Sequence, residues 1–151
     1  MTRLLIVDDE KNIREVVKEY SLLNGYEVDE AENGIEALNL FNRNEYDCVV
    51  LDIMMPDMDG LEVCKKLREN SNIPILMLSA KSEDMDKIQG IMTGADDYIC
   101  KPFKSLELIV RIRALIRRSY FLNSKIEISD DIMSNLKEDG YSISYYDSNI
   151  F

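Results

Sequence analysis

The sequence predicts an α/β protein built on a doubly wound, five-stranded parallel sheet with helices on both faces. Short apolar runs, of which residues 4–7 and 48–51 are the clearest, alternate with segments whose apolar residues recur at helical spacing. Acidic residues follow these runs directly: Asp8 and Asp9 close the first, and Asp52 closes the second. Ligands bind at the carboxyl edge of open α/β sheets, so we expect the three carboxylates to form a site there.

The composition is that of one globular domain. A chain of 151 residues, with 46% hydrophobic and 31% charged residues, can bury one core but not two. No apolar stretch is long enough for a bilayer and no signal-peptide pattern follows Met1, so we expect a cytoplasmic protein without membrane contact. The net charge of -11 argues against a polyanion-binding surface and favours cation binding at the acidic cluster.

The cysteines do not suggest a disulfide framework. Cys48, Cys64 and Cys100 are odd in number and scattered among apolar neighbours, and the chain contains no histidine to share a metal with them. We therefore expect buried, reduced thiols rather than a zinc site or a disulfide.

The elements of the first half follow from turn signals and periodicity. Apolar residues recur at helical intervals from Ile13 to Leu23, where Asn24 and Gly25 stop the helix. Residues 26–31 alternate apolar and acidic side chains, which is typical of a half-exposed edge strand. We expect, in order, a strand at 4–7, a helix at 13–23, a strand at 26–31, a helix at 35–42 and a strand that ends at Asp52.

The second half continues this alternation. The segment that begins at Ser82 combines an N-cap residue with an acidic first turn. The last periodic segment has arginines near its end, where they suit the helix dipole. We expect, in order, a helix marked by Leu61, Cys64 and Leu67, a strand at 73–78, a helix from Ser82, a strand at 98–100 and a helix at 105–118.

Five short motifs fall at the expected strand ends. They are Asp8-Asp9, Asp52 with Met55-Pro56-Asp57-Met58-Asp59-Gly60 after it, Ser79-Ala80, Gly94-Ala95-Asp96-Asp97-Tyr98 and Lys101-Pro102-Phe103. Together they resemble the receiver domain of bacterial two-component response regulators, over residues 1–120. The fourth motif and the arginine-ended last helix are similar to the OmpR/PhoB-type branch. The resemblance implies a flavodoxin-like receiver with strand order 2-1-3-4-5.

Asp52 is interpreted as the phosphoacceptor, because a carboxylate can attack phosphorus and form an acyl phosphate. Asp8, Asp9 and Asp52 offer hard oxygen ligands for Mg²⁺, and the resemblance adds the backbone carbonyl of Met54. Such a metal offsets the charge of the carboxylates and of the incoming phosphoryl oxygens. The alternative role for Asp8 and Asp9 is to end a strand and cap the following helix.

Three further residues can bind phosphoryl oxygens: Lys101 through its ammonium group, Ser79 through its hydroxyl and Ala80 through its amide. The resemblance implies that the Lys101–Pro102 bond is cis, and that Tyr98 turns inward when Ser79 moves toward the phosphate. Taken singly, a solvated lysine, a turn serine and a packing tyrosine are the simpler interpretations. Their joint occurrence at one sheet edge favours the site.

A sensor histidine kinase is the implied partner, with a phosphohistidine as donor to Asp52. This chain has no histidine and cannot carry that donor itself. The resemblance implies that phosphorylation repacks the face that includes residues 98–100 and 105–118 and forms a two-fold dimer there. The residues implied to exchange salt bridges are Lys87, Asp97, Glu107 and Arg111. A solvated run of charges is the alternative.

The resemblance ends near residue 120. Residues 121–151 carry two basic and six acidic residues and show no helix-turn-helix pattern, so we expect a short C-terminal extension that binds no nucleic acid. A short strand and helix, or a disordered segment, would suit this extension. Residues 126–131 faintly echo the first strand, so a decayed second receiver is an alternative, and residues 141–146 have the composition of a strand.

Three functions agree with this sequence. The first is a phosphoacceptor that relays phosphate or competes for a kinase, and that catalyses only its own phosphorylation and dephosphorylation. The second is the truncated regulatory part of a DNA-binding transcription regulator. The third is a phosphatase of the haloacid dehalogenase type, which the sequence disfavours because Met54 stands where such an enzyme would place its second aspartate.

Overall fold

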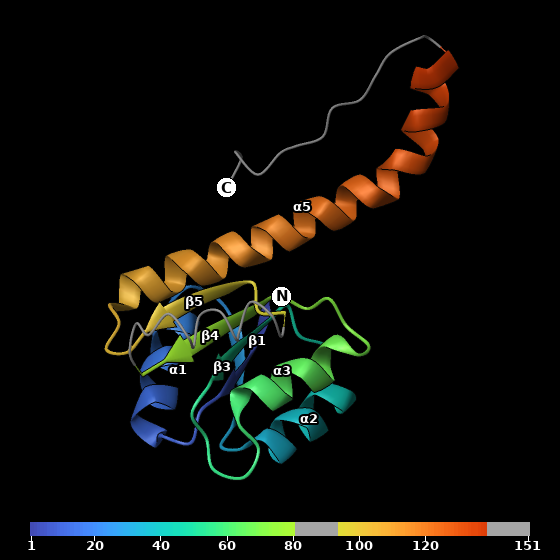
Figure 1. Ribbon diagram of the computed structural model, residues 1–151. Helices are drawn as coiled ribbons and strands as arrows, with labels where there is room; N and C mark the ends of the chain where they lie inside the picture. Colours follow the sequence, from blue (N-terminus) through green and yellow to red (C-terminus); the bar gives the residue numbers. More distant parts are fainter. Residues whose placement is uncertain (81–93, 139–151) are drawn as a thin grey trace.

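The computed structural model describes residues 1–80 and 94–138, with side chains to residue 122. Five parallel strands form one sheet in the order β2-β1-β3-β4-β5. Helices cover both of its faces (Figure 1). The predicted doubly wound, flavodoxin-like fold is therefore confirmed.

Most of the expected elements lie within two residues of their predicted bounds. The helix predicted from Ser82 lies outside the described residues. The elements are β1 (Arg3–Val7), α1 (Lys11–Leu23), β2 (Glu27–Ala31), α2 (Gly34–Arg43), β3 (Cys48–Asp52), α3 (Gly60–Arg68), β4 (Ile75–Ser79), β5 (Asp97–Cys100) and α5 (Ser105–Glu138).

Two hydrophobic clusters, one on each face of the sheet, form the core. Leu5 and Val7 of β1 join the cluster under α2 and α3, whereas Leu4 and Ile6 join the cluster under α1 and α5 (Figure 1). Every residue of β3 and β4 is buried, which explains the continuous apolar runs of the sequence. Each fully buried aliphatic side chain of this kind contributes roughly 1.5–3 kcal/mol relative to an exposed one.

The loop after β3 is fixed by a close backbone approach. Gly60 starts α3, and a Cβ atom there would overlap the backbone carbonyl of Asp52. Its amide donates a hydrogen bond to Ile53 O at 2.9 Å. The side chain of Asp59 caps α3 by accepting a 2.9 Å hydrogen bond from the amide of Glu62. The chain after Asp52 therefore turns tightly into the helix.

The last helix is longer than predicted. α5 runs to Glu138 instead of ending near Arg118, and its second half extends past the body of the domain (Figure 1). The first glycine or proline after Pro102 is Gly140, so the sequence holds no strong helix breaker in this interval. Residues 126–131, whose faint echo of the first strand raised a second receiver as an alternative, lie within this helix. Residues 141–146 lie outside the described residues.

Two further expectations concern the cysteines and the membrane. All three cysteines are free thiols; Cys48 and Cys64 are buried and Cys100 is half-buried. Burial raises the pKa of the Cys48 thiol, which keeps it protonated. Within residues 1–80 and 94–138, no helix is both long enough and apolar enough to cross a membrane.

Candidate functional site

Three carboxylates from two neighbouring strand ends meet at the carboxyl edge of the sheet. Asp8 and Asp9 follow β1, Asp52 ends β3, and one oxygen of each lies within 4.8 Å of the others. Asp9 is exposed, whereas Asp8 is 0% exposed and Asp52 is 2% exposed. The cluster predicted from the sequence is therefore present, and two of its three members are buried.

The ammonium group of Lys101 lies against this cluster. Its Nζ is 2.9 Å from Asp8 Oδ2 and 3.4 Å from Asp52 Oδ1, and it lies 3.9 Å from Glu10 Oε1. The Lys101 amide donates a hydrogen bond to Ser79 O, and the Lys101–Pro102 peptide bond is cis. A single lysine thus faces three carboxylates and cannot neutralise them all.

Burial and charge shift the proton equilibria of the site. Desolvation, followed by the nearby charge of Asp8, raises the pKa of Asp52 to about 7, although Lys101 opposes the shift. Burial by itself would lower the pKa of Lys101, but its hydrogen bond to Asp8 and the surrounding carboxylates raise it above the usual lysine value. The lysine is therefore charged at neutral pH, while Asp52 is poised between its two forms.

The cluster fits a divalent cation. Buried Asp8 Oδ2 has the Lys101 ion pair, and no other described group donates a hydrogen bond to it. Three carboxylates offer the hard oxygen atoms that Mg²⁺ and Ca²⁺ prefer. A cation would also neutralise the negative charge of the carboxylates that Lys101 alone does not balance. The acidic pocket is therefore suited to a metal ion.

The remaining predicted residues lie in or next to β3, β4 and β5. Ser79 ends β4 and is 1% exposed, and Ala80 follows it at the surface. The amide of Met54 donates a long, 3.4 Å hydrogen bond to Asp52 Oδ1. Tyr98 lies in β5, half-buried against the cluster under α2 and α3. The metal role of the Met54 carbonyl and the switch role of Tyr98 stay predictions.

The predicted dimer face is only partly described, because Lys87 lies outside the described residues. Arg111 Nη1 is 3.0 Å and 2.9 Å from the two carboxylate oxygens of Asp97, and its Nε is 3.3 Å from Glu107 Oε1. These three residues therefore pair with one another inside a single chain. The exchange of salt bridges between chains stays a prediction.

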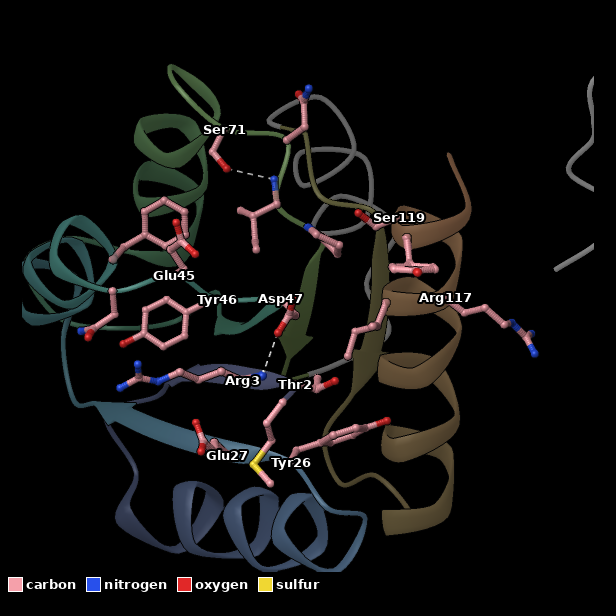
Figure 2. A pocket seen from close by; sticks show the side chains of 18 of the residues that line it. Thr2, Arg3, Tyr26, Glu27, Glu45, Tyr46, Asp47, Ser71, Arg117 and Ser119 are labelled. Carbon is pink, nitrogen blue, oxygen red and sulfur yellow. Dashed lines mark hydrogen bonds between the residues drawn. The ribbon is translucent and has the colours of Figure 1, made fainter. Parts of the chain in front are cut away.

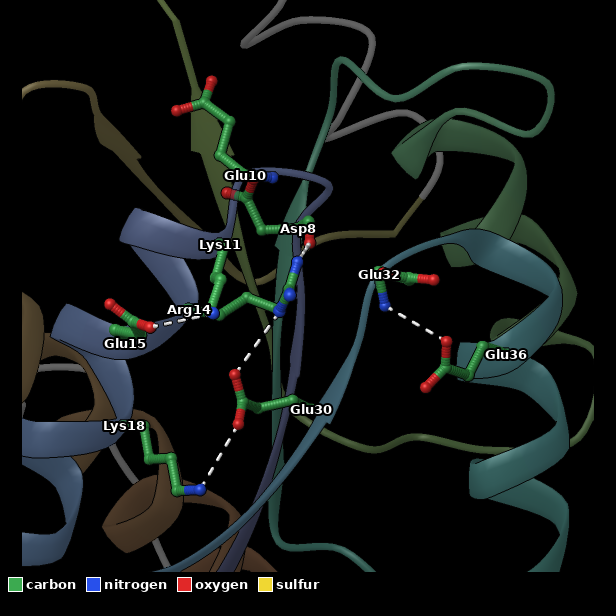
Figure 3. Close-up of polar contacts among 9 residues, drawn as sticks. All are labelled: Asp8, Glu10, Lys11, Arg14, Glu15, Lys18, Glu30, Glu32 and Glu36. Atoms are coloured by element: carbon green, nitrogen blue, oxygen red, sulfur yellow. Dashed lines mark hydrogen bonds and ion pairs between the residues drawn. The ribbon is translucent and has the colours of Figure 1, made fainter.

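Two residues that support the site, Glu10 and Arg14, were not singled out in the sequence. The amide of Glu10 donates to Asp8 Oδ1 at 2.9 Å, and Arg14 Nη1 donates to the backbone oxygen of Asp8 at 2.8 Å. Figure 3 shows Arg14 between Asp8 and Glu30. Glycine at position 60 permits the close approach to Asp52. Helical spacing places Arg14 one turn after Glu10, but no sequence signal indicates its backbone partner.

A hollow lies at the opposite end of the strands. It has a volume of about 1400 Å³ and is lined by Arg3, Tyr46 and Asp47 among others (Figure 2). The carboxylate of Asp47 accepts a 2.8 Å hydrogen bond from the Arg3 amide, so its charge is already engaged. None of the three clustered aspartates lines this hollow. The chemistry of the carboxyl edge, not the size of the hollow, defines the candidate site.

Comparison with known proteins identifies the family. Residues 4–113 match the model of the response regulator receiver domain, and the chain belongs to that family. It is thus a receiver domain of a two-component response regulator. Receiver domains are phosphoacceptor signalling domains that interact with histidine kinases.

One similar relative is the transcriptional regulatory protein SrrA of Staphylococcus aureus, which is 48% identical over 116 residues. That match covers 77% of this chain and 48% of SrrA, so the chain spans about half the length of that relative.

Solved receiver structures have the same fold. The receiver domain of the Francisella response regulator 1452 is 42% identical, with a TM-score of 0.75, over 79% of this chain and 99% of that one. The chemotaxis protein CheY4 of Vibrio cholerae is 34% identical, with a TM-score of 0.73, over 76% and 98% respectively.

Proposed function

We propose that this receiver accepts a phosphoryl group on Asp52 from the phosphohistidine of a sensor kinase, in a Mg²⁺-dependent reaction. The observation that carries the proposal is the position of Asp52: a buried carboxylate with Lys101 Nζ at 3.4 Å and two further aspartates at the same sheet edge. The kinase and its ATP place this reaction, and the chain, in the cytoplasm.

In the transfer, an oxygen of Asp52 forms a bond to phosphorus as the bond from phosphorus to the kinase histidine breaks. The electron pair of the broken bond becomes the lone pair of that nitrogen, and the histidine leaves as neutral imidazole with its proton on the other ring nitrogen. Mg²⁺, when held by Asp8, Asp9, Asp52 and the Met54 carbonyl, offsets the negative charge of the carboxylates and the phosphoryl oxygens.

The protein side chains bind the phosphoryl group from the remaining directions. Lys101 exchanges its ion pair with Asp52 for one with a phosphoryl oxygen, and it keeps Asp8 as its second partner. The Ser79 hydroxyl and the Ala80 amide donate hydrogen bonds to the other oxygens. We expect water to hydrolyse the acyl phosphate at this site, so that the chain catalyses only its own phosphorylation and dephosphorylation.

The direct test is incorporation of acid-labile phosphate from a cognate kinase or from acetyl phosphate. We expect wild-type protein to incorporate phosphate only with Mg²⁺, and Asp52→Asn to incorporate none. Asp57→Asn is the matched control, since it removes a carboxylate from the same loop at a positive φ of 65°, which asparagine tolerates. Full incorporation by Asp52→Asn would contradict the assignment.

The output of phosphorylation is proposed to be a two-fold dimer of the OmpR/PhoB type. The described part of this face holds a groove of about 520 Å³, in which Leu106 and Val110 are 75% and 55% exposed. Asp97, Glu107 and Arg111 line its rim. A dimer would bury this apolar patch and re-pair the rim charges across its two-fold axis. This would explain why an apolar patch and a charged rim lie together at the surface.

Phosphorylation of Asp52 is proposed to change the structure of this face through Ser79 and Tyr98. Ser79 is drawn toward the phosphoryl group, and the ring of Tyr98, which sits on the neighbouring strand, fills the space that it leaves.

Light scattering with Mg²⁺ alone, and then with beryllium fluoride as a phosphoryl mimic, tests the dimer. We expect a shift from monomer to dimer that Arg111→Glu abolishes, with Lys87 as the expected cross-chain partner of the acidic rim. Dimerisation by Arg111→Glu at wild-type strength would contradict this face.

Transcription control is the output that the relatives favour, since SrrA is described as a transcriptional regulatory protein. Residues 1–120 would act as the receiver of such a regulator, and residues 121–151 as an extension that lacks a complete DNA-binding domain. Gel-shift assays with phosphorylated protein test this division, and we expect no retardation of DNA by this chain alone.

A further inference from the structure

We infer that Arg14 is a positioning residue for the metal-binding carboxylate of Asp8. This inference rests on the proposed function, because it concerns how the same acidic site is held in shape. Arg14 lies on α1, and its side chain is largely buried, with 13% exposed. In Figure 3 it extends from α1 to the end of β1.

Asp8 is held at four separate atoms. Its amide donates to Ala31 O at 3.1 Å, and its Oδ1 accepts from the Glu10 amide at 2.9 Å. Its Oδ2 lies 2.9 Å from Lys101 Nζ. Its backbone oxygen accepts from Arg14 Nη1 at 2.8 Å. Arg14 therefore supplies the contact that fixes the peptide plane on the carbonyl side of Asp8.

The position of this carbonyl explains why a side chain is needed. Both β1 and β2 end at the neighbouring pair Val7 and Ala31, so the Asp8 carbonyl lies beyond the last described pairing of the two strands. A buried carbonyl without a donor is unfavourable, and the Arg14 guanidinium provides the donor. Without this donor the peptide after Asp8 is held less firmly, and we expect the orientation of the Asp8 carboxylate to be less fixed.

A second carboxylate holds Arg14 in this position. Arg14 Nε donates to Glu30 Oε1 at 3.3 Å, and Glu30 lies in β2, one residue before the strand ends. The other oxygen of Glu30 accepts from Lys18 Nζ at 3.3 Å. Lys18 is 44% exposed and does not contact Asp8 directly. The chain of contacts thus runs from Glu30 through Arg14 to Asp8, with Lys18 as an outer branch.

Loss of Arg14 should act on metal affinity more than on the chemical step. Groups that orient metal ligands typically change metal affinity by about 10- to 100-fold when they are removed. We expect Arg14→Ala to raise the Kd for Mg²⁺ about 10-fold, measured by isothermal titration calorimetry on the whole chain. At saturating Mg²⁺ the rate of phosphate incorporation should return to within about 3-fold of wild type, because Asp52 and Lys101 are intact.

Two variants separate positioning from general destabilisation. Lys18→Ala removes the outer branch from the same helix and should keep the wild-type Kd for Mg²⁺. Arg68→Ala breaks polar contacts at the far end of the sheet, so it should lower the stability and also keep the wild-type Kd. A lysine at position 14 can reach only one of the two partners, so Arg14→Lys should give an intermediate Kd. Arg14→Lys carries the test if the alanine variant does not fold.

The outcomes distinguish this inference from the function on which it rests. Wild-type protein that binds no Mg²⁺ and incorporates no phosphate overturns the proposed function, and the inference falls with it. The inference alone is overturned by a different result. In that case wild-type protein binds Mg²⁺ and incorporates phosphate, but Arg14→Ala and Arg14→Lys have the same Kd for Mg²⁺ as Lys18→Ala. A raised Kd in the Arg14 variants but not in Arg68→Ala supports it.

Discussion

The two ends of the β-sheet carry similar charged side chains, but the balance of positive and negative charge around them differs. At the amino end, Arg68 donates to Gly94 O, Ile73 O and Asp96 Oδ2, and Asp96 also accepts from the Ile75 amide. Each charge there has opposite charge and hydrogen bonds around it. At the carboxyl end, the carboxylates of Asp8, Glu10 and Asp52 share one lysine.

This difference separates a structural use of charge from a functional one. A satisfied ion pair fixes the chain, whereas a surplus of buried negative charge is unfavourable until a cation arrives. The surplus at Asp8 and Asp52 is therefore evidence for function, and the balance at Arg68 and Asp96 is evidence for stability. Variants at the two ends should accordingly change different measurements.

The largest effect is expected from Lys101→Ala at the carboxyl end. Removal of one preorganised donor to a developing negative charge typically lowers a rate by about 100- to 1000-fold, and we expect a loss of this size in phosphate incorporation. The measurement is the initial rate with acetyl phosphate at saturating Mg²⁺. Lys104→Ala is the control, because that lysine is exposed and makes no described contact with the carboxylates. Equal rates for the two variants would contradict a role for Lys101 in phosphate incorporation.

Arg68→Ala is the matching change at the amino end. The Arg68 side chain is 19% exposed, and its hydrogen bonds connect α3 to the segments before β4 and β5; the substitution removes all of them. We expect the free energy of unfolding to fall by about 2–3 kcal/mol, measured by urea denaturation. Arg43→Ala should cost less than about 0.5 kcal/mol, because its long 3.3 Å hydrogen bond is exposed. An Arg68 variant as stable as Arg43→Ala would contradict the structural assignment of this end.

The sequence predicted the parts of the molecule that follow from local patterns. Strands buried on both faces require continuous apolar runs, so β1, β3 and β4, and the acids that end the first two of them, could be located directly. The support of Asp8 by Arg14 could not, because it depends on a long side chain that reaches a backbone atom of another element.

The last helix was predicted too short for a different reason. Its second half extends past the sheet, and the helical spacing that marks a core-facing stripe ends near Leu115 and Ile116. Helix length there depends on the absence of breakers, a weaker signal than burial.

The pH dependence of stability should also differ between the two ends. The pKa of Asp52 is raised from 3.8 to about 7, so in this range the folded protein binds more protons than the unfolded chain. Its free energy of unfolding therefore falls as the pH rises from 4 to 7. We expect the burial of this carboxylate to lower the free energy of unfolding of metal-free protein at pH 7 by about 2–4 kcal/mol, because each pKa unit corresponds to roughly 1.4 kcal/mol.

Urea denaturation of wild-type and Asp52→Asn protein in EDTA isolates this contribution. The difference in stability between the two should grow from pH 4 to pH 7 in favour of the variant. Added Mg²⁺ should reverse the order, since it stabilises only a site that has its carboxylates. A difference that does not depend on pH would show that Asp52 is not destabilised by its surroundings.

The smallest effect is expected from Tyr46→Phe, near the amino end. The Tyr46 hydroxyl donates to Asp29 Oδ2 at 2.6 Å, and burial followed by this contact raises its pKa to about 12. Phenylalanine keeps the ring against Phe41 and under Arg3, and Asp29 keeps its 2.7 Å ion pair with Arg3, so only the hydrogen bonds of the hydroxyl, with Asp29 and Asn44, are lost.

We expect Tyr46→Phe to lower the free energy of unfolding by about 1 kcal/mol at neutral pH. This contribution is complete below pH 10 and disappears as the pH rises toward 12, because the ionised phenol cannot donate to a carboxylate. Tyr120→Phe, at an exposed position, should change nothing. The Kd for Mg²⁺ should stay at its wild-type value in both variants; a change in Tyr46→Phe would mean that the two ends of the sheet are coupled, and that the charges at the amino end are not purely structural.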